Sequence, residues 1–241
     1  MFSTPSEKTI ERVSKEIGQI IENNNELIET VVSQKEKHKG AKILSASMDG
    51  AHMHIRKEGY KSATAATITT YGDNLKDRKT TYLGHIPEEN RLTIKERLII
   101  AVKLMEKKYS FIYKVFLADG ERAIWEFAKE KFRDFIHITD FFHVSEHIAK
   151  FANIYFGENN FKGKRWYKNY RHILAKKENG RDKLIRTIKY ILSKKMPRSK
   201  REKLEKEFIY FKNNYDRMDY YESGCRFNQF PLIFLTLIDK F

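Results

Sequence analysis

The stretch that decides the fold is FIYKVFLADG, residues 111–120, a nearly continuous apolar run that ends in Asp119-Gly120. An apolar run of this length with turn residues behind it is typical of a strand buried on both faces of a parallel sheet. Residues 122–132 have helical spacing, and residues 135–139 form a second short apolar run. Strand, helix and strand in this order predict two parallel strands joined by a crossover helix.

The residues before this unit have the pattern of antiparallel strands. Ile43 to Met48 runs into Asp49-Gly50, residues 52–56 alternate between polar and apolar, and residues 63–71 are rich in Thr, Ile and Ala. Because Asp-Gly is a turn signal, these segments predict a three-stranded meander. A capping box, residues 93–96, then predicts the start of an amphipathic helix. Three strands, helix, strand, helix and strand is the order of an RNase H-like sheet.

The rest of the chain has helical spacing from residue 143 almost to residue 221. The predicted fold class is therefore α/β, an RNase H-like mixed sheet with a mostly helical C-terminal insertion or extension. We expect N-terminal helices over residues 1–40, the RNase H-like core over 41–156, a basic helical insertion over 157–221 and a divergent tail over 222–241.

Charge separates these parts. The chain of 241 residues has 47 Lys and Arg against 32 Asp and Glu, a formal charge of +15. Residues 161–212 alone have 19 Lys and Arg and 5 Asp and Glu, so 19 − 5 = +14 of that charge lies there. The single cysteine, Cys225, excludes a disulfide framework and a cysteine-rich zinc site. The longest apolar run, residues 230–238, is too short to span a bilayer. We expect a cytoplasmic protein with no membrane partner.

Aromatic side chains alternate with cations in the basic segment. Cations attract phosphate and rings can stack on bases, which predicts contact with DNA or RNA. The alternative is a solvated helical face over an aromatic core. The predicted nucleic-acid-binding residues are Lys162, Lys164, Arg165, Lys168 and Arg171.

Two carboxylates are the candidate metal ligands. Asp49 and Asp119 each follow an expected strand and precede a glycine. If these two strands are neighbours, the carboxylates converge and can hold Mg²⁺, which prefers oxygen ligands. Two such ions about 4 Å apart can activate a nucleophile and stabilise the leaving oxygen of a phosphodiester. The alternative is that each Asp-Gly pair is only a turn.

Asp140 and His143 lie where the last strand meets the next helix. A carboxylate is favourable at a helix N-terminus, so we expect both residues to have a supporting role. A zinc site on His143 and His147 would need a third ligand, and nothing in the pattern specifies His52, His54 or His137 for it.

Four blocks of sequence, in order, resemble a known family. They are Met48-Asp49-Gly50-Ala51 followed by Arg56-x-x-Gly59-Tyr60-Lys61, then residues 117–125, residues 139–147 and residues 210–220. Together they resemble the ISKra-type insertion-sequence transposases, a group of the Mutator-like DDE transposases. The resemblance covers residues 43–221.

The resemblance implies an RNase H-like catalytic domain with a helical insertion. It implies that Asp49 and Asp119 are the first two metal-binding acids, with Mg²⁺ or Mn²⁺ as cofactor, and that Asp140 and His143 are the supporting pair. The implied activity is DNA transposition by cleavage and strand transfer. The implied partners are transposon ends and target DNA in the bacterial nucleoid, and a homo-oligomer stays an open alternative.

The chain departs from the family pattern after residue 220. A Glu-Ser-x-Cys-Arg sequence, residues 222–226, follows directly where the family has a longer block with the third acid. Either Glu222 is a displaced third acid or the third acid is lost. We expect a family member that is shortened at both ends, and we expect residues 227–241 to be a frame-shifted sequence. The alternative function is an inactive transposase relic that only binds DNA. On the loss of the third acid we expect weak metal binding and no transposon excision.

Overall fold

The computed structural model describes residues 38–222 apart from 39, 56–58, 73–76 and 86–88, together with residues 8, 12, 13 and 16. The expected N-terminal helices and the tail after residue 222 lie outside this part of the chain. The residues that follow Glu222, the candidate for a displaced third acid, belong to that tail.

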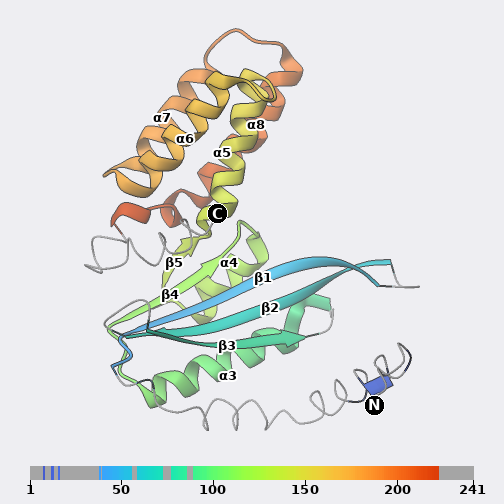
Figure 1. The fold of residues 1–241 in the computed structure, drawn as a ribbon, viewed down its shortest axis with the longest axis vertical. Coiled ribbons are helices and arrows are strands. Elements are labelled where there is room, and N and C mark those ends of the chain that lie inside the picture. The colour runs from blue at the N-terminus through green and yellow to red at the C-terminus, as the bar shows by residue number, and fades with distance from the viewer. Residues whose placement is uncertain are drawn as a thin grey trace, which may run out of the picture.

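The described chain is an α/β fold built on one five-stranded mixed sheet (Figure 1). The strands are β1 Ile43–Ile55, β2 Gly59–Tyr71, β3 Arg78–His85, β4 Tyr113–Ala118 and β5 Ile136–Thr139. Their order across the sheet is β3-β2-β1-β4-β5. β1, β2 and β3 are antiparallel neighbours, whereas β1, β4 and β5 run parallel. The expected pair of parallel strands joined by a crossover helix is confirmed in β4 and β5, and three antiparallel strands precede it as expected, although their bounds differ from the predicted ones.

The expected turn at Asp49-Gly50 is wrong. β1 continues through these residues to Ile55, and its pairing with β2 extends from Ile43↔Tyr71 to Ile55↔Gly59. The local turn preference of Asp-Gly is overridden because the ladder with β2 continues through both residues, with Asp49 opposite Ala65 and Gly50 opposite Thr64. The segment expected as the third strand is therefore most of β2, and the true third strand, β3, was not predicted.

Two apolar cores cover the two faces of the sheet. The first joins alternate residues of β1, such as Leu44, Ala46 and Met48, to helices α3 Leu92–Lys108 and α4 Arg122–Lys131. The second joins Ile43, Val115 and Ile138 to the C-terminal helices. Adjacent residues of a strand point to opposite faces, which is why neighbours on β1 belong to different cores.

Helix α3 does not begin with the expected capping box. Its N-cap is Arg91, in a left-handed backbone conformation, and Thr93 lies inside the first turn. The reason is that the 3-10 turn η1, Glu89–Arg91, leads directly into the helix two residues earlier than the capping residue predicts.

The C-terminal helices form a bundle beyond the β5 edge of the sheet (Figure 1). They are α5 Phe141–Phe156, α6 Phe161–Lys176, α7 Gly180–Leu192 and α8 Arg198–Asn214, followed by the short 3-10 helix η2, Tyr215–Arg217. Helix α5, which the predicted division placed in the core, packs against both α6 and α8. No helix within the described residues is long and apolar enough to cross a membrane.

The sheet core predicts a large cost for removing its central ring. Phe116 is fully buried and stacks on Phe132 with ring centroids 5.3 Å apart. We expect Phe116→Ala to lower the free energy of unfolding by about 3–5 kcal/mol, because it removes apolar contacts and leaves a cavity. Urea denaturation followed by circular dichroism measures this. The control is Tyr82→Ala, since Tyr82 is 80% exposed. A cost for Phe116→Ala no larger than that of the control would contradict the assigned core.

Candidate active site

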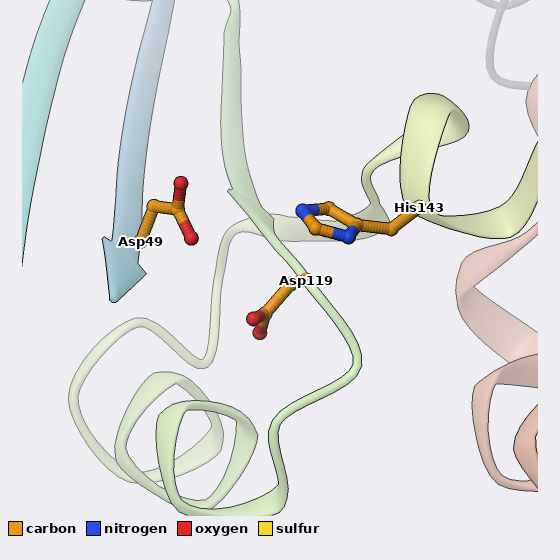
Figure 2. A group of neighbouring side chains, drawn as sticks. All are labelled: Asp49, Asp119 and His143. Carbon is orange, nitrogen blue, oxygen red and sulfur yellow. The ribbon is translucent and has the colours of Figure 1, made fainter. Parts of the chain in front are cut away.

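Asp49 and Asp119 lie side by side because β1 and β4 are parallel neighbours. Met48 pairs with Ala118 in the register, so the next residue of each chain segment is one of the two acids. Figure 2 shows both carboxylates at this edge of the sheet. The expected convergence of the two acids is confirmed, although Asp49 lies within β1 and only Asp119 follows the end of its strand.

His143 completes a group of three potential metal ligands. It lies in the first turn of α5, and one side-chain ligand atom from each of Asp49, Asp119 and His143 lies within 4.8 Å of the others (Figure 2). Two carboxylates and an imidazole suit Mn²⁺ as well as Mg²⁺, since Mg²⁺ prefers oxygen ligands and imidazole favours transition metals. Glu222 is exposed and is not part of this group among the described residues.

Backbone hydrogen bonds hold the acids of this region in place. The Asp119 carboxylate accepts a 2.9 Å hydrogen bond from the Glu121 N–H. Asp140 caps α5 by accepting a 2.7 Å bond from the Phe142 N–H, and its own N–H donates to the Ala118 carbonyl at 2.8 Å. Asp140 therefore ties the start of α5 to the end of β4 and sets the position of His143.

Burial is the main cause that raises the pKa of the Asp140 carboxyl above its ordinary value. The bond from the Phe142 N–H and the nearby His143 oppose this shift, while the negative charges of Asp49 and Asp119 add to it. The environment thus disfavours a third negative charge beside the two candidate ligands. This agrees with a supporting role for Asp140.

A pocket of about 520 Å³ opens beside Asp119, and its lining residues include Arg91, Gly120, Glu121, His143, His147 and Tyr210. The Tyr210 ring forms its wall. This ring stacks on the His147 imidazole with centroids 3.4 Å apart, and the His147 Nδ1 lies 2.5 Å from the Glu207 Oε2. Burial is the main cause that raises the pKa of the Tyr210 hydroxyl, and the charges of Asp119 and Asp140 raise it further.

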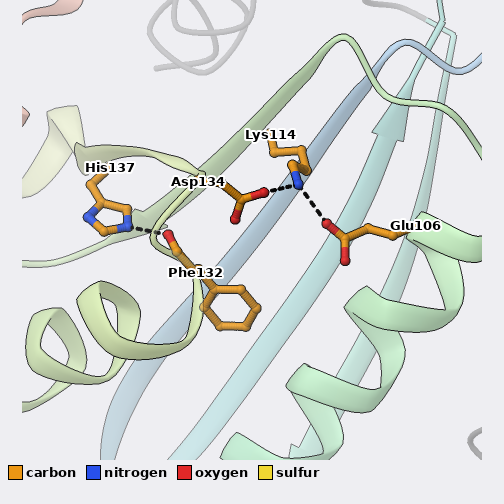
Figure 3. A network of polar contacts seen from close by, with 5 residues as sticks. All are labelled: Glu106, Lys114, Phe132, Asp134 and His137. Atoms are coloured by element: carbon orange, nitrogen blue, oxygen red, sulfur yellow. Dashed lines mark hydrogen bonds and ion pairs between the residues drawn. The ribbon is translucent and has the colours of Figure 1, made fainter.

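The structure does not bring the predicted zinc alternatives together. His147 is bound to Glu207 on α8 and is not in the three-residue group. His137 lies 2.9 Å from the Phe132 carbonyl oxygen (Figure 3). The side chains of His52 and His54 lie outside the described part of the structure.

An ion-pair network marks the opposite end of β4. Lys114 binds Asp134 and also Glu106, the latter at 2.8 Å, and so joins α3 to the loop before β5 (Figure 3). Asp134 is therefore an acid on the same sheet but away from the candidate ligands.

The late sequence block, residues 210–220, fastens the bundle to the sheet. The Arg217 guanidinium lies 4.5 Å from the centre of the Trp125 ring. The Tyr220 hydroxyl donates a 2.8 Å hydrogen bond to the Thr139 carbonyl, and the Thr139 hydroxyl donates to the Asn214 side-chain oxygen at 3.3 Å. Asp219 pairs with Arg181 at 3.1 Å, so it is held by α7.

Sequence reasoning missed Tyr210 and Arg91, which line the pocket, and Glu207, which binds the lining residue His147. Tyr210 belongs to a block that was noticed, but its spacing does not say that it reaches Gly120. Glu207 and Arg91 had no signal, because a single charged residue on a helix or loop has no distinguishing pattern. Arg91 pairs with Glu121 at 2.8 Å across the mouth of the pocket.

The predicted nucleic-acid-binding residues all lie on α6. Lys162, Lys164, Arg165 and Lys168 are exposed. Arg171 differs from them, because it is partly buried and its guanidinium lies 5.4 Å from the centre of the Phe141 ring. Its position suits packing between α6 and the start of α5.

No protein-family model matches the chain, and no curated protein matches it. The functional argument therefore depends on the residues and on the geometry of this site.

The contact of Gly120 with Tyr210 gives a test of the pocket wall. A Cβ added at Gly120 would lie 2.3 Å from the Tyr210 Cε2, and the backbone of Gly120 does not have a positive φ. We expect Gly120→Ala to lower the free energy of unfolding by about 1–3 kcal/mol through overpacking. In a Tyr210→Ala background the same change should cost little. Thermal or urea denaturation of the four proteins completes the double-mutant cycle, and equal costs in both backgrounds would contradict the contact.

The raised pKa of Asp140 predicts a pH-dependent effect of Asp140→Asn. As pH rises above about 4, the unfolded chain loses this proton before the folded protein does, so the wild type loses stability across that window. Asparagine keeps the capping oxygen and has no charge. We expect the variant to gain stability relative to wild type as pH rises from 4 to 7, measured by denaturation without divalent metal. A difference that does not change with pH would refute this.

Proposed function

We propose that this chain is a DDE-type transposase that acts by metal-dependent cleavage of DNA phosphodiesters and strand transfer, on an RNase H-like fold. The observation that carries the proposal is the convergence of Asp49 and Asp119 with His143 at one edge of the sheet. A mixed sheet in the order β3-β2-β1-β4-β5, with the second acid directly after β4, is the arrangement that the family resemblance requires.

The donor set fits a divalent cation of the Mg²⁺ or Mn²⁺ kind. Asp49 and Asp119 would hold the metal through carboxylate oxygens, and His143 offers a nitrogen ligand within reach. Bound ions of this type supply activation of water or of a DNA 3′-hydroxyl and neutralise charge on the phosphate. Asp140 positions His143 from the helix cap, and Arg91 places a cation at the mouth of the pocket.

The meeting of all four sequence blocks supports the same proposal. Blocks that are up to 170 residues apart, counted from Asp49 to Asp219, contact one another around this site. Gly120 of the second block touches Tyr210 of the fourth, and Thr139 of the third binds Asn214 and Tyr220. The gathering of these blocks beside two converging acids is what a functional site predicts, whereas packing alone does not require it.

The charge of the helical bundle supports DNA as the partner. Helix α6 contains six Lys and Arg and no acidic residue. Four of the five predicted binding residues on it are exposed. Such a surface attracts a polyanion irrespective of sequence. Transposon ends and target DNA, within the bacterial nucleoid, are the proposed substrates.

The second candidate is a relic that binds DNA without cutting it. What favours it is that the described ligand group contains two acids and a histidine, while Glu222 lies outside it. A third carboxylate would otherwise complete the cage for the metal.

A cleavage assay separates the two candidates. Under the transposase proposal the purified chain nicks plasmid or oligonucleotide DNA in Mn²⁺ or Mg²⁺, whereas under the relic, which the loss of the third acid predicts, it does not. Asp49→Asn and Asp119→Asn should each lower the rate at least about a hundredfold, roughly 2.7 kcal/mol of transition-state stabilisation. Asp134→Asn is the matched control, since it removes an acid that binds Lys114 at the opposite end of β4 from Asp119 and should leave the rate within about twofold.

Thermal denaturation provides a readout that does not need activity. An ion that binds only the folded state raises the melting temperature, and the stabilisation grows with the logarithm of its concentration over the dissociation constant. We expect such a rise with Mn²⁺ in wild type, smaller in His143→Ala and absent in Asp49→Asn. DNA binding with neither cleavage nor a metal-dependent shift would favour the relic.

A further inference from the structure

A second hollow lies on the helical bundle, between the C-terminal end of α5 and the first half of α6. It measures about 830 Å³, and its lining includes Phe156, Phe161, Lys162, Arg165, Trp166 and Lys168. We call it the α6 groove. We propose that the α6 groove binds an unpaired nucleotide of single-stranded DNA, with the base against the aromatic side chains and the phosphates on the cations. This rests on the proposed function in that DNA is the partner.

The back of the α6 groove is a fixed aromatic wall. Trp166 stacks on Phe151 with centroids 5.6 Å apart and lies 4.5 Å from the Tyr170 ring. Gly163 lets α6 approach α5 closely, because a Cβ there would lie 3.2 Å from the Phe156 Cβ. A wall held by packing on several sides costs little further ordering when a flat ligand enters.

Phe161 is the feature that packing does not explain. It is the first residue of α6 and 77% of it is exposed. An exposed phenyl ring costs hydration free energy, and it contributes nothing to the attraction of phosphate. A ring beside cations is what stacking on an unpaired base requires, because every base has a flat face.

The cations of the groove arrange the rest of the ligand. Lys162, Arg165 and Lys168 lie three residues apart along α6, and all three line the groove together with Phe161. The backbone N–H of Lys162 donates a 2.8 Å hydrogen bond to the side chain of the cap residue Asn160, so only the side chain of Lys162 is available to a ligand. Their side-chain charges are thus placed to meet a phosphate backbone that passes the ring. An intact duplex presents the phosphates but keeps its bases stacked inside, so it cannot use Phe161.

Helix α5 connects this groove to the candidate active site. His143 lies in its first turn and Phe156 is its last residue, which are 13 residues apart. At 1.5 Å per residue this is about 20 Å along the helix. One strand of DNA covers that length in about six nucleotides. A single DNA molecule is therefore long enough to reach both places.

The experiment is binding of a fluorescent single strand and of a matched hairpin duplex, measured by anisotropy in EDTA. We expect Phe161→Ala to weaken single-strand binding between about 5-fold and about 150-fold, the range measured for loss of one stacked base. Its effect on the duplex should stay within about twofold. A 2-aminopurine base in the single strand should be quenched by wild type and less so by this variant.

Two controls separate stacking from charge and from general exposure of a ring. Lys164→Ala removes an exposed cation of the same helix that does not line the groove, so it should weaken both DNAs by a similar factor. Tyr190→Ala removes a ring that is 65% exposed on α7 and should change neither. Circular dichroism checks that each variant folds.

An equal loss for both DNAs in Phe161→Ala, or no loss, would overturn the proposal. The result is independent of catalysis, because EDTA removes divalent metal. If cleavage is absent but Phe161→Ala weakens binding of the single strand only, the groove proposal is supported and the transposase proposal fails. If cleavage occurs and Phe161 has no effect, the groove proposal alone fails.

Discussion

The parallel pairing of β1 with β4 is the constraint on which the candidate site depends. The register sets Met48 beside Ala118, so Asp49 and Asp119 follow at the same level of the sheet. Because side chains alternate along a strand, a slip of one residue would turn Asp49 to the other face. The antiparallel ladder with β2 supports β1 from the other side along its whole length, from Ile43 to Ile55. A long strand thus serves to hold one carboxylate in place.

The helical bundle completes the site from a distance in sequence. Thr139, at the end of β5, is hydrogen-bonded to both Asn214 and Tyr220. These bonds dock the C-terminal part of the bundle on the sheet, where the Tyr210 ring lies against Gly120. The Tyr210 ring beside the pocket and the two acids therefore come from separate layers of the molecule. Buried contacts of this kind are rigid, since close-packed interiors have few alternative arrangements.

Charge is divided between these layers in a way that fits one polyanionic substrate. The acids gather at the sheet edge, where metal ions would be needed to let a phosphate approach. The cations lie on α6, together with the exposed ring of Phe161. Under our proposals α5 sets the spacing between the place where DNA is cut and the place where an unpaired base is held.

The sequence by itself determined the parallel strands β4 and β5, the helices after residue 121 and the two acids that meet. These features come from hydrophobic spacing and from residues at strand ends, which are local signals. The tertiary structure alone decided that β1 passes through Asp49-Gly50, that His147 binds Glu207, and that Tyr210 covers Gly120. Each of these depends on a partner at least 14 residues away, such as Thr64 opposite Gly50. Turn and capping preferences extend over about four residues, so they cannot report a cross-strand bond or a ring that arrives from a distant helix.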